Sequence, residues 1–424
     1  MIRDGFNCSP APGSQGTTLG RIAILYPSDP AGHVPSGIDS FIRGMLKWAP
    51  TELDYTLYGA SSDITQRPLG VRSQIELGRR PIHFLPVTSV DPNGMRQRIP
   101  LTVRFIQGLR KAQRAGLLDA HDVLDVHRIE PLLILRNDPR PKNVYMHQDM
   151  SVLRDAGSDI LWSKAPAIYE WAERTLLQGA DRVFCVRETA VSRYRQRYPE
   201  LAERFAFTPT WVDTDVFVPR PKILTHLAAR ASLKREKGIS ETGPLIITVG
   251  RLDKQKDPFL MLRSFASVRA DVPDAQLAFI GDGALRRALE AEIAALQLQD
   301  SVTLLGALPG LEISKVLWAA DLFALSSAYE GMPIAVLEAL ACGLPIVSTN
   351  VGEVTRVVRT GFNGAVVSER SPRAMSRAML ETLRQSGRSV IEQNCFSSVI
   401  PFTAEAVLGD LYQNHRRQAA RGIS

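Results

Sequence analysis

Short runs of apolar and β-branched residues alternate with longer helix-period segments along almost the whole chain, and the alternation begins again near Leu245. This pattern is typical of parallel sheets covered by helices, because each strand returns to the same edge of its sheet through a helix. We therefore expect an α/β chain with two Rossmann-like domains. The first series predicts strands at 21–26, 55–59, 82–85, 123–126, 143–146 and 183–186, with helices that include 38–48 and 167–177. The second predicts strands at 245–249, 276–280, 302–305, 322–325, 346–348 and 365–367.

The domain boundary is predicted between the two series, where prolines interrupt any helix and favour an extended connection. The predicted parts are a leader at 1–20, an N-terminal domain at 21–208, a connection at 209–221 and a C-terminal domain at 222–400. A last helix at 401–417 is expected to pack back on the N-terminal domain.

Composition excludes several classes of protein. The 424 residues are 45% hydrophobic and 22% charged, so the chain is expected to fold rather than stay disordered. The four cysteines lack the spacing of a zinc site or a disulfide framework, and no metal is expected. No apolar run reaches the ~18 residues of a membrane span, and the leader lacks the apolar core of a signal peptide. We expect a cytoplasmic protein whose net charge of +7 suits an anionic partner.

The strongest local signal is the segment 326–345, which follows an apolar strand and contains a helix that ends near Gly343. Pro333 suits the first helical position, where its missing N–H costs nothing. Glu330 is then expected in the loop before the helix, beside the unpaired amides that favour an anion. Glu338 lies farther along the same helix, where a carboxylate can accept hydrogen bonds from vicinal hydroxyls such as those of a ribose.

A second signal follows the predicted strand at 245–249. Arg251 and Lys256 come after Gly250, and Lys254 is an alternative for the second cation. Because ligands of open α/β sheets bind outside the carboxyl ends of the strands, these cations are expected to lie near the ligand. They would neutralise a leaving diphosphate.

The ordered combination of these motifs resembles the retaining GT-B glycosyltransferases, the large family that includes bacterial α-mannosyltransferases, α-glucosyltransferases and sucrose synthases. The resemblance covers roughly residues 245 to 367. It is carried by Val249-Gly-Arg-Leu with Lys256, Ile280-Gly-Asp-Gly283, Leu305-Gly306, Glu330 with Glu338, Ala341-Cys-Gly-Leu-Pro345 and Gly361-Phe-Asn-Gly364.

The resemblance implies a GT-B fold in which two domains face each other across a cleft, with the acceptor mainly on the first domain and a nucleotide sugar on the second. It implies that Arg251 and Lys256 hold the donor diphosphate, that Glu330 contacts the transferred sugar and that Glu338 contacts the ribose. The remaining implied donor contacts are the backbone around Gly331, Met332, Pro333 and Ile334. The region after Leu305 is similarly expected to line the pocket for the base.

Two segments of the N-terminal half match the family more weakly. Gly37 lies in a loop that follows the first predicted strand, like the family's glycine loop near the donor phosphate, but the usual paired glycines are missing. His147 ends a predicted strand, as the family's active-site histidine does. His127 also follows a strand and is a weaker candidate for lining the acceptor cleft.

The implied reaction is transfer of a hexose-type sugar from a UDP-, GDP- or ADP-linked donor, without a cofactor and with retention at the anomeric carbon. The chain offers no obvious carboxylate nucleophile, so front-side attack is favoured, with His147 supporting the sugar. The acceptor is expected to be a glycan, a lipid-linked molecule or a polysaccharide precursor. A nucleotide-sugar epimerase of the same fold is the alternative function.

Other motifs favour different interpretations. Asp213 and Asp215 have the spacing of a metal-binding pair but fall in the predicted connection, where a structural role is favoured. Gly281 and Gly283 lack the third glycine of a dinucleotide fingerprint, so NAD binding is not expected. Aromatic residues make up 7% of the chain and do not cluster among the cations, which disfavours nucleic-acid binding.

A basic segment runs from Arg96 to Arg114 with no acidic residue between Asp91 and Asp119. At 100° per residue its apolar residues fall on one helical face and most of its cations on the other. The apolar face contains Leu101, Phe105, Leu109 and Ala112, and the opposite side contains Arg104, Arg110, Lys111 and Arg114. This pattern predicts a helix that packs on the sheet and turns its cations outward. The outward face would contact an anionic membrane surface; the alternatives are a basic face that contacts only solvent and one that binds a phosphorylated soluble acceptor.

Overall fold

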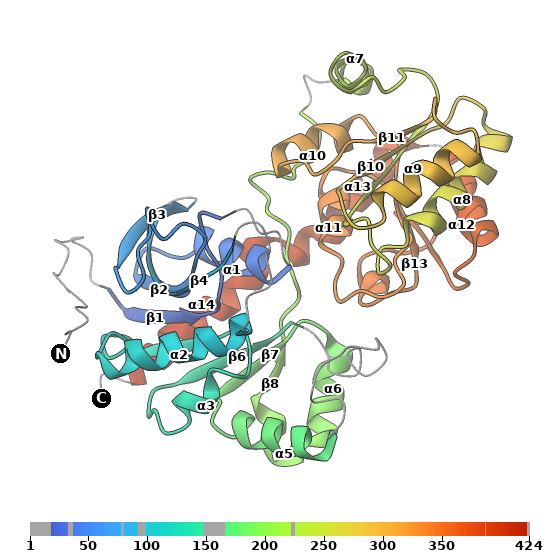
Figure 1. Ribbon diagram of the computed structural model, residues 1–424. Helices are drawn as coiled ribbons and strands as arrows, with labels where there is room; N and C mark the ends of the chain where they lie inside the picture. The colour runs from blue at the N-terminus through green and yellow to red at the C-terminus, as the bar shows by residue number, and fades with distance from the viewer. Residues whose placement is uncertain are drawn as a thin grey trace. The chain divides into compact units, whose positions relative to one another are not determined.

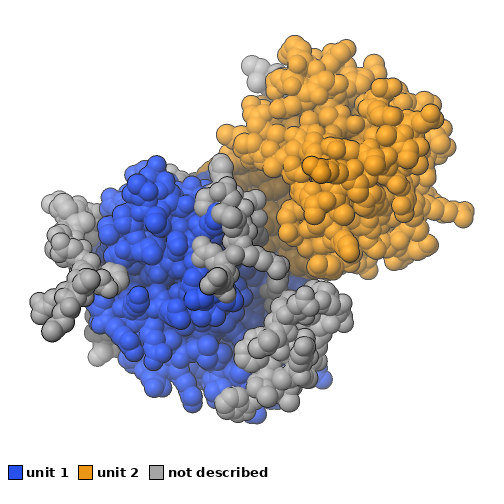
Figure 2. All heavy atoms as spheres, viewed as in Figure 1, with its two compact units in different colours: residues 1–209, 407–424 blue, residues 210–406 orange. Residues whose placement is uncertain are grey.

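The computed structural model describes residues 18–32, 37–77, 80–91, 99–147, 166–221, 225–385 and 387–421. The chain forms two compact units (Figure 2), and each is considered by itself. The first unit consists of Met1–Pro209 and Val407–Ser424, and the second consists of Thr210–Ala406.

The first unit is built on an eight-stranded sheet with the order β3-β4-β2-β1-β5-β6-β7-β8. Neighbouring strands are parallel except β3 and β4, which pair antiparallel. The strands are β1 (Gly20–Leu25), β2 (Leu53–Ser61), β3 (Ser73–Leu77), β4 (Arg80–Ser89), β5 (Val123–Val126), β6 (Lys142–Met146), β7 (Arg182–Cys185) and β8 (Phe205–Phe207). The helices before the second unit are α1 (Gly37–Lys47), α2 (Leu101–Arg114), α3 (Leu132–Leu135), α5 (Pro166–Leu177), α6 (Glu188–Arg197) and the 3-10 helix η2 (Pro199–Arg204).

Helix α2 packs as its periodicity predicts. Phe105, Leu109 and Ala112 are buried in the hydrophobic core of the first unit. Arg110, Lys111 and Arg114 are exposed on the other side of the helix. Arg104 is partly buried, because its guanidinium donates to the carbonyl of Ser89 over 2.8 Å. Arg96 and Arg98 lie outside the described residues.

The last helix, α14 (Ala404–Arg421), joins the first unit from Val407 onward. Figure 1 shows it in red among the blue strands of that unit. Its His415 is fully buried and contacts two side chains of the sheet. His415 Nε2 lies 2.8 Å from Oδ2 of Asp125, and His415 Nδ1 lies 2.9 Å from the hydroxyl of Tyr55. Gln418 adds a 2.9 Å hydrogen bond to Oδ1 of Asn143, so buried polar contacts fix this helix on the sheet.

The second unit is built on a six-stranded, entirely parallel sheet with the order β11-β10-β9-β12-β13-β14. The strands are β9 (Leu245–Val249), β10 (Gln276–Ile280), β11 (Val302–Leu304), β12 (Leu322–Leu325), β13 (Ile346–Thr349) and β14 (Gly364–Val367). The helices are α7 (His226–Lys237), α8 (Pro258–Asp271), α9 (Arg286–Ala295), α10 (Gly310–Trp318), α11 (Ile334–Ala341), α12 (Pro372–Leu383) and α13 (Arg388–Val399), with the 3-10 helices η3 (Val354–Arg356) and η4 (Ile400–Phe402).

Two helical layers cover this second sheet. One hydrophobic core joins it to α7, α10, α11 and α13, and another joins it to α8, α9 and α12. Central strands such as β10 and β12 are buried along their whole length, which explains their mainly apolar sequences.

The segments that enter and leave the second unit run side by side. Val212 forms a parallel bridge with Thr403, and its N–H donates to the carbonyl of Phe402 over 2.9 Å. Trp318 secures the entering segment with a 2.8 Å hydrogen bond to the carbonyl of Val218.

Candidate active site

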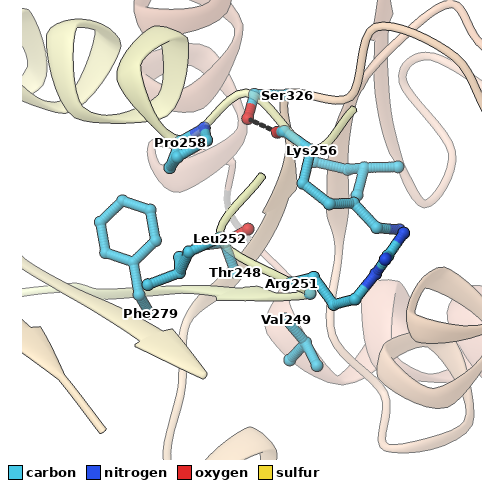
Figure 3. Close-up of a pocket in the computed structure, with 10 residues that line it drawn as sticks. Thr248, Val249, Arg251, Leu252, Lys256, Pro258, Phe279 and Ser326 are labelled. Carbon is cyan, nitrogen blue, oxygen red and sulfur yellow. Dashed lines mark hydrogen bonds between the residues drawn. The ribbon is translucent and has the colours of Figure 1, made fainter. Parts of the chain in front are cut away.

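A hollow lies at the carboxyl ends of β9, β10 and β12 in the second unit (Figure 3) and encloses about 270 Å³ of empty space, including open solvent. The loop after β10 closes against the loop after β9. A Cβ on Gly281, whose φ is +135°, would lie 2.0 Å from the carbonyl oxygen of Gly250, so this close approach requires a glycine. The lining residues are Thr248, Val249, Gly250, Arg251, Leu252, Lys256, Pro258, Phe279, Leu325 and Ser326.

Lys256 and Glu330 form a partly buried ion pair beside the hollow. The ammonium Nζ of Lys256 lies 2.6 Å from Oε1 of Glu330, and Ser327 donates to the same oxygen over 2.6 Å. The Glu330 side chain is only 8% exposed and that of Lys256 22%. The aliphatic stem of Lys256 packs over Gly250, where a Cβ would meet its carbons at 3.1 Å. The structure therefore brings together two residues that the sequence separates by 74 positions.

Arg251 is held much more loosely. Its side chain is 66% exposed and pairs with Asp253 over 3.1 Å. In Figure 3 its side chain extends to the same side of the hollow as that of Lys256. The neighbouring Lys254 is exposed. Arg251 is thus a largely exposed cation at the rim of the hollow, held among the described residues only by Asp253 and by a 3.4 Å hydrogen bond to Oε1 of Gln255.

The turn that carries Lys256 is fixed by contacts that the sequence analysis did not identify. Asp257 adopts a left-handed conformation with φ +45°, caps α8 through the N–H of Leu260 and pairs with Arg370 beyond β14. The hydroxyl of Ser326 donates to the carbonyls of Lys256 and Asp257, each over 2.9 Å. The sequence Asp257-Pro258 is a helix-start signal that could have indicated the cap. The pairing with Arg370 joins positions too distant for any local signal.

The segment before α11 presents backbone amides at the carboxyl end of β12. Helix α11 begins at Ile334, so Pro333 precedes the helix rather than opening it. Within the described part of the chain, the N–H groups of Gly331, Met332 and Ile334 donate no backbone hydrogen bond. Such amides at the start of a helix favour an anion.

The loop after β13 contacts this segment through its backbone. The N–H of Glu353 donates to the carbonyl of Gly331 over 2.9 Å. A Cβ on Gly352, whose φ is +53°, would lie only 1.8 Å from the same carbonyl oxygen. Gly352 therefore lets the backbone after β13 approach the segment that presents the amides.

Glu338 lies on α11, and the pKa of its carboxyl is raised. Burial raises the pKa of its carboxyl to about 7, the negative charge of Asp213 adds to the increase, and Lys256 opposes it. Glu338 therefore lies within electrostatic reach of Lys256. Asp213 itself closes a turn, because its Oδ1 accepts a 3.1 Å hydrogen bond from the N–H of Asp215.

His147 lies in the first unit, directly after β6, and it contacts a second histidine. Its Nε2 lies 3.0 Å from Nδ1 of His127, which follows the neighbouring strand β5. Burial lowers the pKa of His147 to about 3. His127 is only 1% exposed, so it supports His147 from within rather than lining a surface.

Gly37 opens α1 at the amino end of the helix. Residues 33–36 of the expected glycine loop, like most of the expected leader, lie outside the described residues. The described residues contain no group of three or more histidine, cysteine, aspartate or glutamate side chains placed to hold a metal ion.

Sequence comparison matches residues 229–394 to the family described as glycosyl transferases group 1. Residues 229–394 are a glycosyltransferase group 1 domain. This domain contains Arg251, Lys256, Glu330 and Glu338, and it accounts for most of the second unit.

The curated relatives match just over half of the chain. A D-inositol 3-phosphate glycosyltransferase of Thermobispora bispora is 29% identical over 53% of this chain and 52% of its own length. A GDP-mannose-dependent alpha-(1-6)-phosphatidylinositol monomannoside mannosyltransferase of Mycolicibacterium smegmatis is 28% identical over 55% of this chain and 60% of its own. The chain thus spans about half the length of the curated relatives it matches.

Solved structures extend the similarity of fold to nearly the whole chain. Sucrose-phosphate synthase of Thermosynechococcus elongatus matches 95% of this chain and 100% of its own, with a TM-score of 0.76 and 20% identity. HepE of Anabaena, solved with UDP and glucose, matches 93% of this chain and 99% of its own, with a TM-score of 0.68 and 16% identity. The chain has the α/β GT-B fold, which confirms the predicted fold class.

Proposed function

We propose that this chain is a retaining glycosyltransferase, which moves a sugar from a nucleotide-diphosphate sugar to a glycan or lipid-linked acceptor. One observation carries the proposal: Lys256, Glu330 and the free amides before α11 meet at the carboxyl ends of parallel strands inside a glycosyltransferase group 1 domain. Ligands of open α/β sheets bind at this edge. The reported relatives are named as transferases, and no observation favours the epimerase alternative.

In this proposal, the second unit holds the donor and stabilises its leaving group. Arg251 and Lys256 bind the diphosphate, whose negative charge grows as the bond to the sugar breaks, and the amides of Gly331, Met332 and Ile334 lie at the distal phosphate and sugar. Preorganised cations and amides lower the barrier because they need little rearrangement when the charge develops. Pro333 keeps this segment extended before the helix.

The two carboxylates have different proposed roles. Glu330, fixed by Lys256 and Ser327, contacts the transferred sugar, whereas Glu338 accepts hydrogen bonds from the ribose. In the first unit, which we propose binds the acceptor, His147 contacts the transferred sugar and Gly37 lies near the donor phosphate. Front-side attack of the acceptor within an ion pair would retain the anomeric configuration, with the departing phosphate helping to remove the acceptor's proton. This scheme requires no cofactor and no metal ion.

The names of related proteins supply candidate donors. One curated relative is named as GDP-mannose-dependent, and solved neighbours were crystallised with UDP or with ADP. We therefore propose a UDP-, GDP- or ADP-linked sugar as the donor substrate.

Thermal denaturation of the full chain with UDP, GDP or ADP tests the donor site. A ligand present at 100 times its Kd stabilises the folded state by about 2.7 kcal/mol. We expect one of the three to raise the Tm, and Glu338→Ala to remove most of that increase because the ribose loses its acceptor. Arg377→Ala, on the exposed face of α12, is a control expected to keep the increase. If none of the three nucleotides shifts the Tm, the proposed donor site is wrong.

We further propose that α2 contacts an anionic membrane and thereby brings the enzyme to a lipid-linked acceptor. The exposed Arg110, Lys111 and Arg114 lie opposite the buried face of the helix, and cations near an anionic leaflet contribute about 1 kcal/mol each. One curated relative is named for a phosphatidylinositol-based acceptor, which is consistent with this location. No helix in the described residues is long and apolar enough to cross a bilayer, so the proposed contact is peripheral.

Flotation with vesicles containing phosphatidylserine tests the contact. We expect binding at low salt that weakens as salt screens the charges, and loss of binding when Arg110, Lys111 and Arg114 are all changed to Glu. Changing Lys234, Arg235 and Lys237 of α7 to Glu is the matched control, because it alters net charge by the same amount in the second unit. Equal flotation of the two triple variants would show that α2 is not the membrane contact.

A further inference from the structure

Two adjacent parallel strands place a pair of imidazoles side by side in the first unit. The last residue of β5, Val126, pairs with Val144, and β6 continues beyond this pair to Met146. His127 and His147 directly follow the two strands, and their rings stack with centroids 5.3 Å apart and planes inclined by 16°. The shortest polar contact joins Nδ1 of His127 to Nε2 of His147 over 3.0 Å.

Aromatic neighbours fix both rings in this arrangement. His127 stacks on Tyr145 at 4.4 Å with nearly parallel planes, and the edge of Phe41 contacts both histidine rings. Tyr145 is itself anchored, because its hydroxyl donates to Asp125 over 3.0 Å. His127 can therefore neither rotate away from His147 nor exchange this contact for solvent.

Neither imidazole carries a positive charge near neutral pH. Burial lowers the pKa of His147 to about 3, and burial with the nearby His147 and His415 lowers the pKa of His127 well below its ordinary value. Each neutral ring carries one N–H group, so the hydrogen between Nδ1 and Nε2 belongs to one of the two rings. The identity of the donor ring decides which nitrogen of His147 remains for a substrate.

The surroundings of His127 select the donor. If His147 donated, His127 would carry its proton on Nε2, which is buried and has no hydrogen-bond partner among the described residues. A buried N–H group without an acceptor is the costlier arrangement, because lone pairs are left unpaired more readily than N–H groups. The favourable arrangement places the proton of His127 on Nδ1, from which it donates to His147.

We propose that His127 is a positioning residue that donates a hydrogen bond to Nε2 of His147 and leaves the Nδ1–H of His147 as its only polar group available to a substrate. His147 then acts as a hydrogen-bond donor to a sugar oxygen and not as a general base, because its basic nitrogen is occupied. This inference rests on the proposed function for its substrate, but the state of the two rings can be measured without any substrate.

Nitrogen NMR of the full chain labelled with ¹⁵N-histidine tests the tautomers directly. At pH 7 we expect His147 to show a protonated Nδ1 and an unprotonated Nε2, with its signals assigned by their loss in His147→Gln. In His127→Phe, which keeps a ring but removes the donor, the tautomer ratio of His147 should shift toward Nε2–H. A His147 that is cationic or already protonated on Nε2 in the unmodified protein overturns the proposal.

Kinetics supply a second readout. The release of nucleoside diphosphate from GDP-mannose, UDP-glucose or ADP-glucose is followed in three forms of the chain: unmodified, His127→Phe and His127→Asn. The amide nitrogen of Asn takes the place of Nδ1, so His127→Asn should keep kcat within a few fold, whereas His127→Phe should lose at least tenfold in kcat with little change in KM. Equal rates for the two variants overturn the positioning role.

The two readouts separate failure of this inference from failure of the proposed function. If the unmodified chain releases no nucleotide from the three donors, the NMR result still decides the tautomer, and the proposed function is what fails. If His127→Phe does not fold, the spectrum of the unmodified protein and the His127→Asn rates remain decisive.

Discussion

Glu338 combines a partly buried position with a carboxyl pKa of about 7, well above the ordinary value of 4.5. Between these two pH values the folded protein holds a proton that the unfolded chain has lost. The free energy of unfolding should therefore fall as pH rises from about 4.5 to about 7, by up to about 1.4 kcal/mol per pH unit, and the contribution should be constant above that range.

Replacing Glu338 by Gln removes this titration while keeping the shape of the side chain. We expect Glu338→Gln to become more stable relative to the unmodified protein as pH rises from 5 to 8, because it avoids burying a charge. Urea unfolding of both proteins at several pH values in this range measures the difference. A constant difference across the range would mean that Glu338 is ionised throughout and that burial does not control its pKa.

Arg251 and Lys256 are both proposed to bind the donor diphosphate, so the prediction concerns the removal of both charges together. Removing both charges, by Arg251→Ala with Lys256→Met, should lower kcat by about 10² to 10³, the usual effect of losing a preorganised charge-stabilising group. The KM for the donor should change less, because the diphosphate charge grows in the transition state. Steady-state rates with the donor found by thermal denaturation provide the measurement.

Lys254→Ala is the matched control for this loss of charge, because Lys254 lies in the same loop and is exposed. It should retain near-normal kcat. A double variant as active as this control would show that neither Arg251 nor Lys256 contributes to catalysis.

At the level of single residues, the sequence could indicate which side chains follow a strand but not what fixes them. Arg251, Lys256 and Glu330 were predicted because each follows an apolar strand. The hydrogen bond from Ser327 and the pairing of Arg370 with Asp257 depend on contacts between distant loops. The hydrogen bond between His127 and His147 depends on the register of β5 with β6, which no local pattern encodes.

At the level of secondary-structure elements, the loop after β13 packs against the segment before α11. The contact is between Gly352 and the carbonyl of Gly331, and only glycine permits it. Gly352→Ala would place a methyl group 1.8 Å from the carbonyl oxygen of Gly331. We expect a loss of several kcal/mol, because the contact adds to the cost of a left-handed backbone, which alone is about 1 kcal/mol. The nucleotide-induced increase in Tm should also fall, since the amides shift.

Gly361→Ala separates these two effects. Gly361 has a similar left-handed backbone, with φ +79°, but a Cβ there meets nothing within 4 Å. This variant should lose only about 1 kcal/mol and should keep the response to nucleotide. Equal losses in the two variants, measured by urea unfolding, would show that the approach to Gly331 is unimportant.

The sequence predicted every strand of the second sheet but missed both edge strands of the first. Strands β9, β10, β12 and β5 lie where their mainly apolar runs predict, because strands buried on both faces of a sheet have few polar residues. Strands β3 and β8 were missed. Strand β3 alternates exposed and partly exposed residues at the edge of the sheet, and β8 has three residues, too few to form a recognisable pattern.

For the whole molecule, the first unit depends on a helix that lies beyond the second unit in the sequence. Ending the chain before Val407 would remove the contact of His415 with Asp125 and uncover the buried polar and apolar side chains on which α14 packs, and losing one partner of a buried pair is strongly destabilising. We expect the first unit to unfold while the second stays folded. Limited proteolysis should then yield a resistant fragment close to Thr210–Ala406.

A chain that ends at Arg421 is the control, because it retains all of α14. It should show the proteolytic pattern of the full chain. If removal of α14 left the first unit as resistant as in this control, the buried contacts of His415 and Gln418 would contribute little to its stability.

The second unit is, in effect, an insertion between two pieces of the first. Its entering and leaving segments are already joined by the bridge between Val212 and Thr403, so its two junctions belong to one structural element. An exchange of residues 210–406 for the corresponding cassette of a related enzyme would therefore leave every strand of the first sheet and most of α14 in place. Under the proposed division of roles, with the donor on the second unit and the acceptor on the first, such chimaeras should change the nucleotide-sugar preference and retain the acceptor preference.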